Sequence, residues 1–492
     1  ELANLASPPT ITLDDTGSNT YVLKASGTGA FKSTLNAVAT GTNAVTNTAD
    51  ATFSGFSSVA LTAALLDTAS VAQVSTLGTM RLSSVSGLTL ATSGTRSSLS
   101  GSTDFSTLAI TGTSLGTISE SAGAYAKVSY GAISAGDGVT SIAISGGTGS
   151  DVTTGAITAS GSLIDTVSIT SGESSTTNSF GTIDANTGTI ASLTQTVGFA
   201  AAAHTSTVSA AAITKAAVTY GTGSTSVLTF GDATDAMVLS SLTLAGRPTS
   251  ASVNLIGTSA VVSAAGIEGT SAVTITSTLT GALTATGGPG ADNISGGAGN
   301  DSLSGGAGID TLMPGAGADT VDGGAGADII TLTTDGASDT IRLGTTASSA
   351  DTISGFLVGA TNGDILRFAS GTSGGVAHGT SAAVTGDIAT HSVAGNLAAT
   401  AGVFAYRIAT NTASSSVADL LTAIGGTITA ANAADVLYFL VDNGTDTFVY
   451  RGAASGITAN TAITADEIAL VATLTGVADA TAVVFNNIGF SG

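Results

Sequence analysis

The sequence predicts an all-β protein whose chain winds into an elongated parallel β-solenoid and ends in a mixed β domain. The first observation is compositional: Ala, Thr, Ser, Gly and Val dominate, while aromatic residues make up only 4% of the chain. A core of small and β-branched side chains favours thin, repetitive sheets over a thick globule. The second observation is a series of short apolar alternations, and the third is a nine-residue unit that repeats without a slip.

Residues 1–285 are predicted to form many short strands. Apolar residues alternate with Ser or Thr, and Gly-rich turns follow, in the pairs Leu108/Ile110, Ile142/Ile144, Val167/Ile169, Leu242/Leu244 and Val273/Ile275. Such strands are unstable alone, so they must stack, either as a solenoid or as a series of small β-sandwiches. We favour the solenoid because the strands lead into the nine-residue units without a change in composition. Residues 61–74 are the one candidate helix in this region.

Five nine-residue units stand head to tail, starting at Gly287, Gly296, Gly305, Pro314 and Gly323. Glycine tolerates positive φ, so each six-residue loop can curl until its carbonyl groups point inward. An Asp closes each loop and adds a hard anionic oxygen, which suits Ca²⁺ with its six to eight oxygen ligands. The three residues after each Asp are expected to form a strand whose central aliphatic side chain, two places after the Asp, faces the core.

Two glycines and one aspartate of each unit are the candidate calcium ligands and loop formers. They are Gly288, Gly290 and Asp292; Gly297, Gly299 and Asp301; Gly306, Gly308 and Asp310; Gly315, Gly317 and Asp319; and Gly324, Gly326 and Asp328. Without cations the stacked aspartates would repel one another, which argues against a turn ladder that binds no metal. Two prolines depart from the pattern. Pro289 takes a variable place, whereas Pro314 replaces a leading glycine, so its loop is expected to be the least regular.

The repeat resembles that of the RTX (repeats-in-toxin) family of calcium-dependent, type I-secreted bacterial proteins. In the β-roll of that family, two units make one coil, and each ion lies between a loop and the loop two units later. The resemblance implies several Ca²⁺ ions held by the pairs Asp292 with Asp310, Asp301 with Asp319, and Asp310 with Asp328. A fourth site follows if Asp335 or Asp339 closes the end of the roll. An isolated match to the loop at residues 146–151 is predicted to be a turn, because Thr153 stands where the aliphatic residue belongs.

The region after the repeats resembles the end of a secreted β-roll protein. Residues 351–356 and 362–368 resemble the strand pair that seals such a roll, and a cap is physically required because a solenoid end exposes unpaired backbone. A helix is predicted near residues 416–424, and a hairpin with strands at 436–442 and 447–450. Further strand-like stretches follow at 468–471 and 474–477. The predicted domains are therefore residues 1–285, the β-roll and cap at 286–368, and a C-terminal assembly and secretion-signal domain at 369–492.

Charge and composition disfavour several classes of function. The chain contains 11 Lys and Arg but 33 Asp and Glu, which gives a net charge of -22. Nucleic acid is therefore not an expected partner. Cysteine is absent, which leaves calcium as the substitute for disulfides in an extracellular protein. No apolar run approaches the ~20 residues that span a bilayer. No signal peptide is visible at the start of the sequence, so either the start has been removed or export uses another signal.

No catalytic constellation is evident, and the protein is expected not to be an enzyme. A zinc protease needs His-Glu-x-x-His, but none of His204, His378 and His391 is followed by Glu. We expect all three histidines at the surface. The Gly-x-Ser-x-Gly strings at 112–116 and 371–375 do not lie between a strand and a helix, as a hydrolase nucleophile would.

The C-terminal region resembles most closely that of calcium-dependent surface-layer (S-layer) proteins of Gram-negative bacteria. This resemblance implies a secreted structural protein at the cell surface that self-assembles into a two-dimensional lattice or another homo-oligomer. Its N-terminal region would then bind lipopolysaccharide or join neighbouring subunits. The alternative is a calcium-stiffened secreted adhesin or fibre subunit, and a weaker one is a degraded or accessory hydrolase.

Overall fold

In this computed structural model the chain divides into two compact units, Glu1–Thr274 and Ile275–Gly492. The structure describes residues 115–343 except 126, 137, 160–162, 176, 202 and 234–235, then 350–359, 362–369, 412, 414–424, 436–453 and 465–483, together with the strands given below for the rest of the chain.

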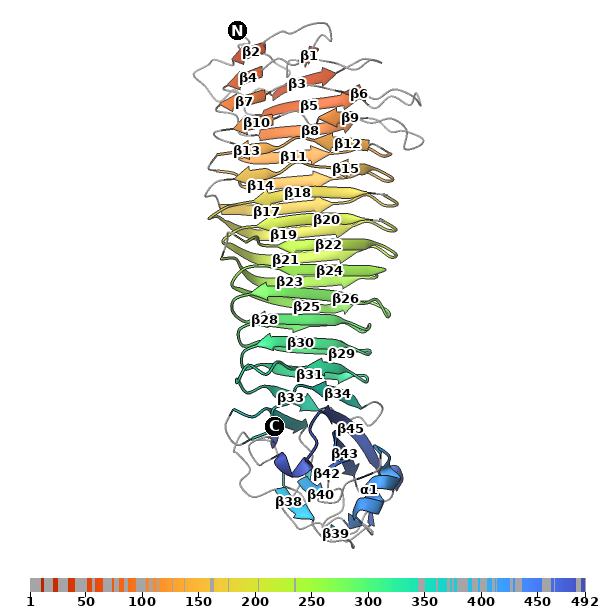
Figure 1. Ribbon diagram of the computed structural model, residues 1–492. Helices are drawn as coiled ribbons and strands as arrows, with labels where there is room; N and C mark the ends of the chain where they lie inside the picture. The colour runs from red at the N-terminus through yellow and green to blue at the C-terminus, as the bar shows by residue number, and fades with distance from the viewer. Residues whose placement is uncertain are drawn as a thin grey trace. The chain divides into compact units, whose positions relative to one another are not determined.

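The first unit is a parallel β-solenoid whose strands stack coil upon coil into two sheets (Figure 1). One sheet contains, in order, β1 (Thr10–Thr12), β3 (Thr34–Ala39), β5 (Ser58–Ala64), β8 (Gly87–Ser93), β11 (Thr117–Ser121), β14 (Ser141–Ser145), β17 (Leu163–Thr170), β19 (Thr189–Val197), β21 (Ala212–Tyr220), β23 (Val238–Gly246) and β25 (Ser259–Ile267). Each strand pairs in parallel with the next.

The second sheet of this unit is built in the same way. It contains β2 (Tyr21–Lys24), β4 (Ala51–Ser54), β7 (Thr79–Ser83), β10 (Ala109–Gly112), β13 (Ile133–Ala135), β16 (Ile157–Ala159), β18 (Asn178–Asp184), β20 (His204–Ser209), β22 (Thr225–Phe230) and β24 (Ser250–Leu255). A short extra column, β6 (Gln73–Val74), β9 (Thr103–Phe105), β12 (Lys127–Tyr130) and β15 (Asp151–Thr153), merges into β18.

Columns of aliphatic side chains fill the interior of the solenoid. Ile118, Ile142 and Val167 occupy one register position on successive strands, and each is at most 1% exposed. Every member of the predicted apolar pairs that the structure describes is buried; Leu108 lies outside the described residues. Continuous parallel pairing confirms the solenoid and excludes separate sandwiches within the described coils.

The predicted helix at residues 61–74 is wrong where the structure describes that stretch. Residues 61–64 belong to β5, and Gln73 and Val74 form β6. Strand β5 pairs with β3 over residues 58–63 and with β8 over residues 58–64, which satisfies its backbone, so the stacked coils override local helix propensity.

The second unit starts at Ile275, in β26 (Val273–Leu279), and is a roll of short coils. One parallel sheet contains β27 (Leu283–Thr286), β29 (Ser302–Ala307), β31 (Thr320–Ala325), β33 (Thr340–Leu343), β35 (Ile365–Ala369) and β46 (Ile488–Ser491). The other contains β28 (Asn293–Ala298), β30 (Thr311–Ala316), β32 (Ile329–Thr331), β34 (Asp351–Ser354) and β45 (Ile468–Thr475).

Two expectations about this roll need correction. Four strands, β28 to β31, are six residues long rather than three, because the first glycines of the next unit still pair with their neighbours. Residues 351–356 and 362–368 do not pair with each other as a seal. They supply β34 and β35, which extend the two sheets by one more coil, and the C-terminal strands β45 and β46 cover that coil.

The C-terminal part of the second unit is a mixed sheet. From β45 it continues antiparallel to β43 (Thr447–Ala453) and β42 (Val436–Asp442), then in parallel through β40 (Ala405–Ile408) and β38 (Ile388–His391). Smaller elements are β36 (Thr372–Ser373), β37 (Val376–Ala377), β39 (Leu397–Ala398), β41 (Ile428–Thr429), β44 (Ala462–Ile463), α1 (Val417–Ile424), η1 (Ala465–Glu467) and η2 (Ala480–Ala482). The predicted hairpin and helix are both confirmed.

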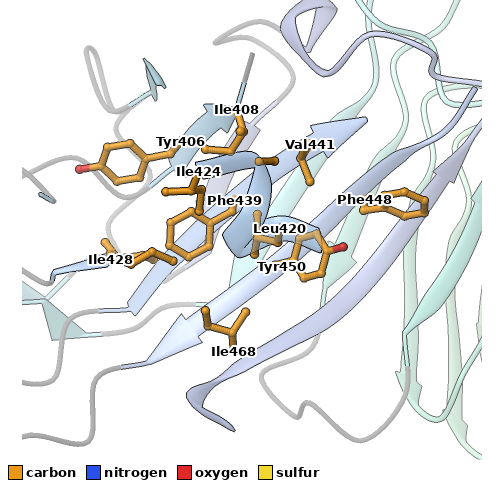
Figure 2. Close-up of a cluster of buried hydrophobic side chains, with 12 residues drawn as sticks. Tyr406, Ile408, Leu420, Ile424, Ile428, Phe439, Val441, Phe448, Tyr450 and Ile468 are labelled. Carbon is orange, nitrogen blue, oxygen red and sulfur yellow. The ribbon is translucent and has the colours of Figure 1, made fainter. Parts of the chain in front are cut away.

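Helix α1 packs on this sheet through its buried apolar side (Figure 2). Its Leu420 and Ile424 join a cluster with Phe439 and Tyr450 of the hairpin. The helix begins where Ser416 accepts a hydrogen bond from the Asp419 N–H through its hydroxyl, which satisfies a donor of the first turn. No helix in the part of the chain that the structure describes is long and apolar enough to cross a membrane.

Candidate metal centre

The repeat aspartates stack directly above one another, one coil apart. The backbone N–H of Asp292 donates to Oδ1 of Asp310 over 2.7 Å, and the same bond joins the Asp310 N–H to Asp328 over 2.9 Å. On the alternate loops, the Asp301 N–H donates to Asp319 over 2.7 Å. The structure therefore brings together each of the three pairs that the resemblance implies.

Both aspartate ladders continue beyond the nonapeptide units. The N–H of Asp319 donates to Asp339, the N–H of Asp328 to Asp351, and the N–H of Asp339 to Asp364. Of the two residues expected to close the end, Asp339 takes the ladder position. Asp335 is exposed instead and accepts hydrogen bonds from Gly317 and Ala337.

Sequence reasoning missed the ladder roles of Asp351 and Asp364, although a signal was present. Each precedes a buried aliphatic residue by two places, Ile353 and Leu366, as in the repeat units. Their loops lack the regular glycines, so the nine-residue period hides them. In Asp364 both carboxylate oxygens accept backbone N–H bonds, from Asp339 and Leu357.

The ladder carboxylates are buried, and four of the repeat aspartates are only half satisfied by the described protein groups. All five repeat aspartates are at most 2% exposed. Among the described residues, Oδ2 of Asp301, Asp310, Asp319 and Asp328 is buried without a hydrogen-bond partner. An unsatisfied buried anion is costly. Burial, reinforced by neighbouring carboxylates and opposed by the backbone hydrogen bonds, raises the pKa of Asp301 to about 7 and that of Asp310 to about 6.

Backbone carbonyl groups lie close to these free oxygens at the leading glycines of two loops, Gly296 and Gly305. A β-carbon added to Gly296 would come within 3.0 Å of both Asp301 Oδ2 and the Pro314 carbonyl oxygen; one on Gly305 would meet Asp310 Oδ2 and the Gly323 carbonyl in the same way. The missing side chain of the leading glycine thus leaves room where hard oxygens converge. Such a donor set fits Ca²⁺, whereas structural zinc prefers nitrogen and sulfur ligands.

No group of three or more Asp, Glu, His or Cys side chains in the described residues surrounds one point. Each ion would therefore be held by at most two carboxylates, one from each of two stacked coils, and by carbonyl groups of the glycine loops. Bound calcium would supply the positive charge that the paired carboxylates lack and would leave them deprotonated.

The residues at the second and fourth positions of each unit have two reasons to be glycine. In the later four units they all have positive φ, at Gly297, Gly299, Gly306, Gly308, Gly315, Gly317, Gly324 and Gly326. A side chain at Gly308 would also collide with the carbonyl oxygen of Gly290 one coil earlier. Gly288 and Gly290, in the first unit, are not among the positive-φ glycines. Pro289 restricts the backbone of the residue before it. Their carbonyl oxygens nevertheless meet Gly306 and Gly308, as those of the later loops meet the glycines one coil further on.

The loop at Pro314, expected to be the least regular, keeps the geometry of its neighbours. Gly315 and Gly317 have φ of 100° and 128°, and Asp319 accepts its ladder bond. The leading residue presents its carbonyl oxygen to the site, and proline retains that oxygen although it lacks an N–H.

Comparison with known proteins agrees with this geometry. Residues 284–312 and 308–335 match the family of RTX calcium-binding nonapeptide repeats, whose model spans four copies. No curated protein and no solved structure shows significant similarity to the chain. The segment is therefore an RTX calcium-binding β-roll. Such repeats are typical of extracellular proteins that Gram-negative bacteria export by type I secretion.

Other residues singled out in the sequence lie elsewhere. His204 is fully buried rather than at the surface: its Nε2 lies 3.3 Å from Gln195 Oε1, and its ring lies 5.1 Å from that of Phe180. Polar neighbours inside the coil accommodate it, and burial lowers its pKa to about 4. His378 and Ser114 lie outside the described residues, and the structure describes only the backbone of His391.

The isolated glycine loop at residues 146–151 forms a turn. The Ser150 hydroxyl donates to the Gly147 carbonyl oxygen over 2.6 Å, and Gly149 has a φ of 64°. Asp151 accepts a hydrogen bond from the Thr177 N–H of the following coil, the reverse of the direction in the calcium ladders. Equivalent Ser-to-Gly bonds recur at Ser175 and Ser224, so this turn belongs to a structural column of the first unit.

Proposed function

We propose that this protein is a calcium-dependent, self-assembling surface-layer or sheath subunit without catalytic activity. The observation that carries the proposal is the repetitive architecture. Most of the described chain consists of stacked coils, so the outer surface presents similar side chains at each step, as at Thr117, Ser141 and Thr166, which share one register position. A repeating surface suits a protein that meets many copies of itself.

Calcium has two roles in this proposal. It neutralises the buried ladder carboxylates of the β-roll, and it allows a chain of net charge -22 to fold compactly and approach its copies. RTX repeats support export by the type I route. We further propose that the protein is held at the cell surface of a Gram-negative bacterium, with lipopolysaccharide as the partner of the N-terminal region.

One observation favours the alternative of a secreted adhesin or fibre subunit. The coils of the first unit stack without interruption from β11 to β25, and such a stack is a stiff spacer that would serve as a stalk. A stalk needs no contact with its copies along its sides, whereas a lattice subunit does.

Electron microscopy of the purified chain, with millimolar Ca²⁺ and with a chelator, separates these functions. Ordered two-dimensional sheets that form in Ca²⁺, disperse in chelator and do not return with Mg²⁺ at matched ionic strength would support the lattice subunit. Mg²⁺ should fail because it requires smaller, octahedral sites and gives up water reluctantly. Single rods or fibres in Ca²⁺ would favour the alternative instead.

A further inference from the structure

The two outer faces of the β-roll differ in charge. On the sheet containing β31, β33 and β35, the outward positions include Asp322, Arg342 and Arg367, which stand next to one another in register. On the other sheet, the outward residues of β28, β30, β32 and β34 are all uncharged. They are Asn293, Ser295, Thr311, Met313, Ile329, Thr331, Thr352 and Ser354, and together they form what we call the neutral face.

The neutral face also exposes large apolar side chains. Met313 is 39% exposed and Ile329 is 45% exposed, and the pairing of Thr311 with Ile329 places them on adjacent strands. Ile309, two residues before Thr311, is 60% exposed. These side chains do not contribute to the core, because the alternate positions of the same strands already place Leu312 and Ile330 inside. Apolar side chains gathered on one exposed face mark an interaction surface.

We propose that the neutral face packs against the neutral face of a second copy of this chain. The charge of the chain limits where two copies can meet. Two copies of net charge -22 repel each other, so they can meet closely only through a surface that buries no unpaired carboxylate. On this face, Met313 and Ile329 would form an apolar centre, and the surrounding hydroxyl groups a polar rim.

Anionic partners fit the neutral face poorly. A phosphate or acidic glycan would need Lys or Arg, and the face has neither. A two-fold contact between sheets is geometrically simple, because the same residues supply both sides and flat sheets pack face to face. The inference rests on the proposed function and names the surface through which copies would meet. It also ties assembly to calcium, since the face exists only when the coils of the roll are stacked.

A charge substitution on each face tests the proposal in the full chain. Ile329→Lys places a cation at the seventh position of a repeat unit on the neutral face, and Thr320→Lys places the same cation at the seventh position on the opposite face. Both make the net charge less negative, so general electrostatics predicts that both should associate more readily. The neutral-face contact predicts instead that Ile329→Lys alone loses association in millimolar Ca²⁺, by at least tenfold in dimerisation constant. Sedimentation measures this, and circular dichroism checks that both variants still fold with Ca²⁺.

Cross-linking provides a second readout, because the chain contains no cysteine. A short bismaleimide should join copies of Thr311→Cys in Ca²⁺ but not copies of Thr320→Cys. Equal cross-linking of the two cysteine variants would overturn the neutral-face contact, and so would an Ile329→Lys variant that associates as strongly as the wild type. In either case, calcium-dependent sheets of the wild type would leave the proposed function standing. If the wild type forms dimers but no sheets, and the Ile329→Lys variant loses those dimers, the contact would be supported and the lattice contradicted. A wild type that stays monomeric in Ca²⁺ would overturn both.

Discussion

The backbone N–H of Asp292 donates to Oδ1 of Asp310 over 2.7 Å, although the two residues are 18 positions apart in the chain. Asp310 thereby holds the preceding coil with one carboxylate oxygen and leaves the other, Oδ2, buried without a hydrogen-bond partner among the described residues. The residue that stacks the coils is therefore also the residue that needs a cation. Calcium binding and coil stacking are therefore coupled, because the two oxygens that serve them belong to the same carboxylate.

Removal of calcium should unfold the repeat segment. Residues 287–331 combine buried like charges with glycines of high chain entropy, so we expect them to be largely disordered in chelator and to form parallel β-structure as Ca²⁺ binds. Far-UV circular dichroism during a Ca²⁺ titration follows this transition, with a midpoint around ~10⁻⁴ to 10⁻³ M, typical of extracellular modules. Identical spectra in chelator and in millimolar Ca²⁺ would contradict it.

Single aspartates should differ in importance according to their place in the ladder. Asp310 lies between two others: it accepts from Asp292 and donates to Asp328. Asp292 is the first repeat aspartate of its ladder, and its Oδ2 accepts from Gly288 in its own loop. Asp310→Ala should therefore weaken calcium-dependent folding more than Asp292→Ala. Calorimetric titration of both variants measures this. Asp310→Asn, which keeps an acceptor oxygen but loses the charge, should still lose calcium affinity.

The calcium-free roll should be more stable in acid than at neutral pH. Burial raises the pKa of Asp301, Asp339 and Asp351 to about 7, from an ordinary value of 3.8. A raised folded-state pKa means that the stability contribution is complete below about pH 4 and is lost as the pH rises through about 7. In calcium-free buffer, β-structure should therefore be retained near pH 4.5 and lost near pH 8, as judged by circular dichroism.

Calcium reverses this dependence, because it binds the deprotonated carboxylates. Its affinity should rise between pH 5.5 and 7.5, and binding at the lower pH should release protons, which calorimetry in buffers of different ionisation enthalpy detects. A pH-independent affinity over this range would show that the ladder carboxylates are already ionised in the calcium-free roll.

A side chain at the glycine in the fourth position of a unit should oppose the stacking of the coils. Gly308 has a φ of 128°, and a β-carbon there would collide with the Gly290 carbonyl oxygen. The backbone strain alone costs about 1–2 kcal/mol, so Gly308→Ala should shift the calcium midpoint of folding to higher concentration. Ala307→Ser, at the exposed neighbouring position, is the matched control and should fold like the wild type.

The regular parts of the structure could be predicted because they depend on local repetition. The stacking of Asp292 under Asp310 and the burial of Ile294 follow from a period that pairs alternate units. The regularity of the fourth loop is not evident from the sequence, where Pro314 replaces the leading glycine. Proline is tolerated there because that position presents only its carbonyl oxygen to the site.

Positions that depend on contacts between distant coils could not be predicted. Asp364 joins the ladder across a coil of different length, accepting from Asp339, which lies 25 residues earlier, rather than 18. His204 looks like a surface residue in sequence, yet Gln195 of the other sheet places a hydrogen-bond acceptor opposite it inside the coil. Neither relationship has a fixed spacing that a period search would detect.

A buried carboxyl in the first unit should make that unit sensitive to alkali. Glu120 is 1% exposed and stands in register between Leu90 and Ile144. In the part of the chain that the structure describes, neither of its carboxylate oxygens has a hydrogen-bond partner. Burial raises its pKa to about 8, from an ordinary value of 4.5. Its stability contribution is therefore complete below about pH 4.5 and is lost as the pH rises through about 8.

Glu120→Gln removes this ionisation and keeps the shape of the side chain. At pH 9 the variant should be more stable than the wild type by about 1–3 kcal/mol, the cost of an unsatisfied buried group, whereas at pH 4.5 the two should be nearly equal. Thermal unfolding at fixed Ca²⁺, followed by circular dichroism at both pH values, measures the difference. Glu173→Gln, on an exposed turn, is the control and should show no such dependence. A wild type and a Glu120→Gln variant with parallel pH profiles would mean that Glu120 reaches solvent or a partner when it ionises.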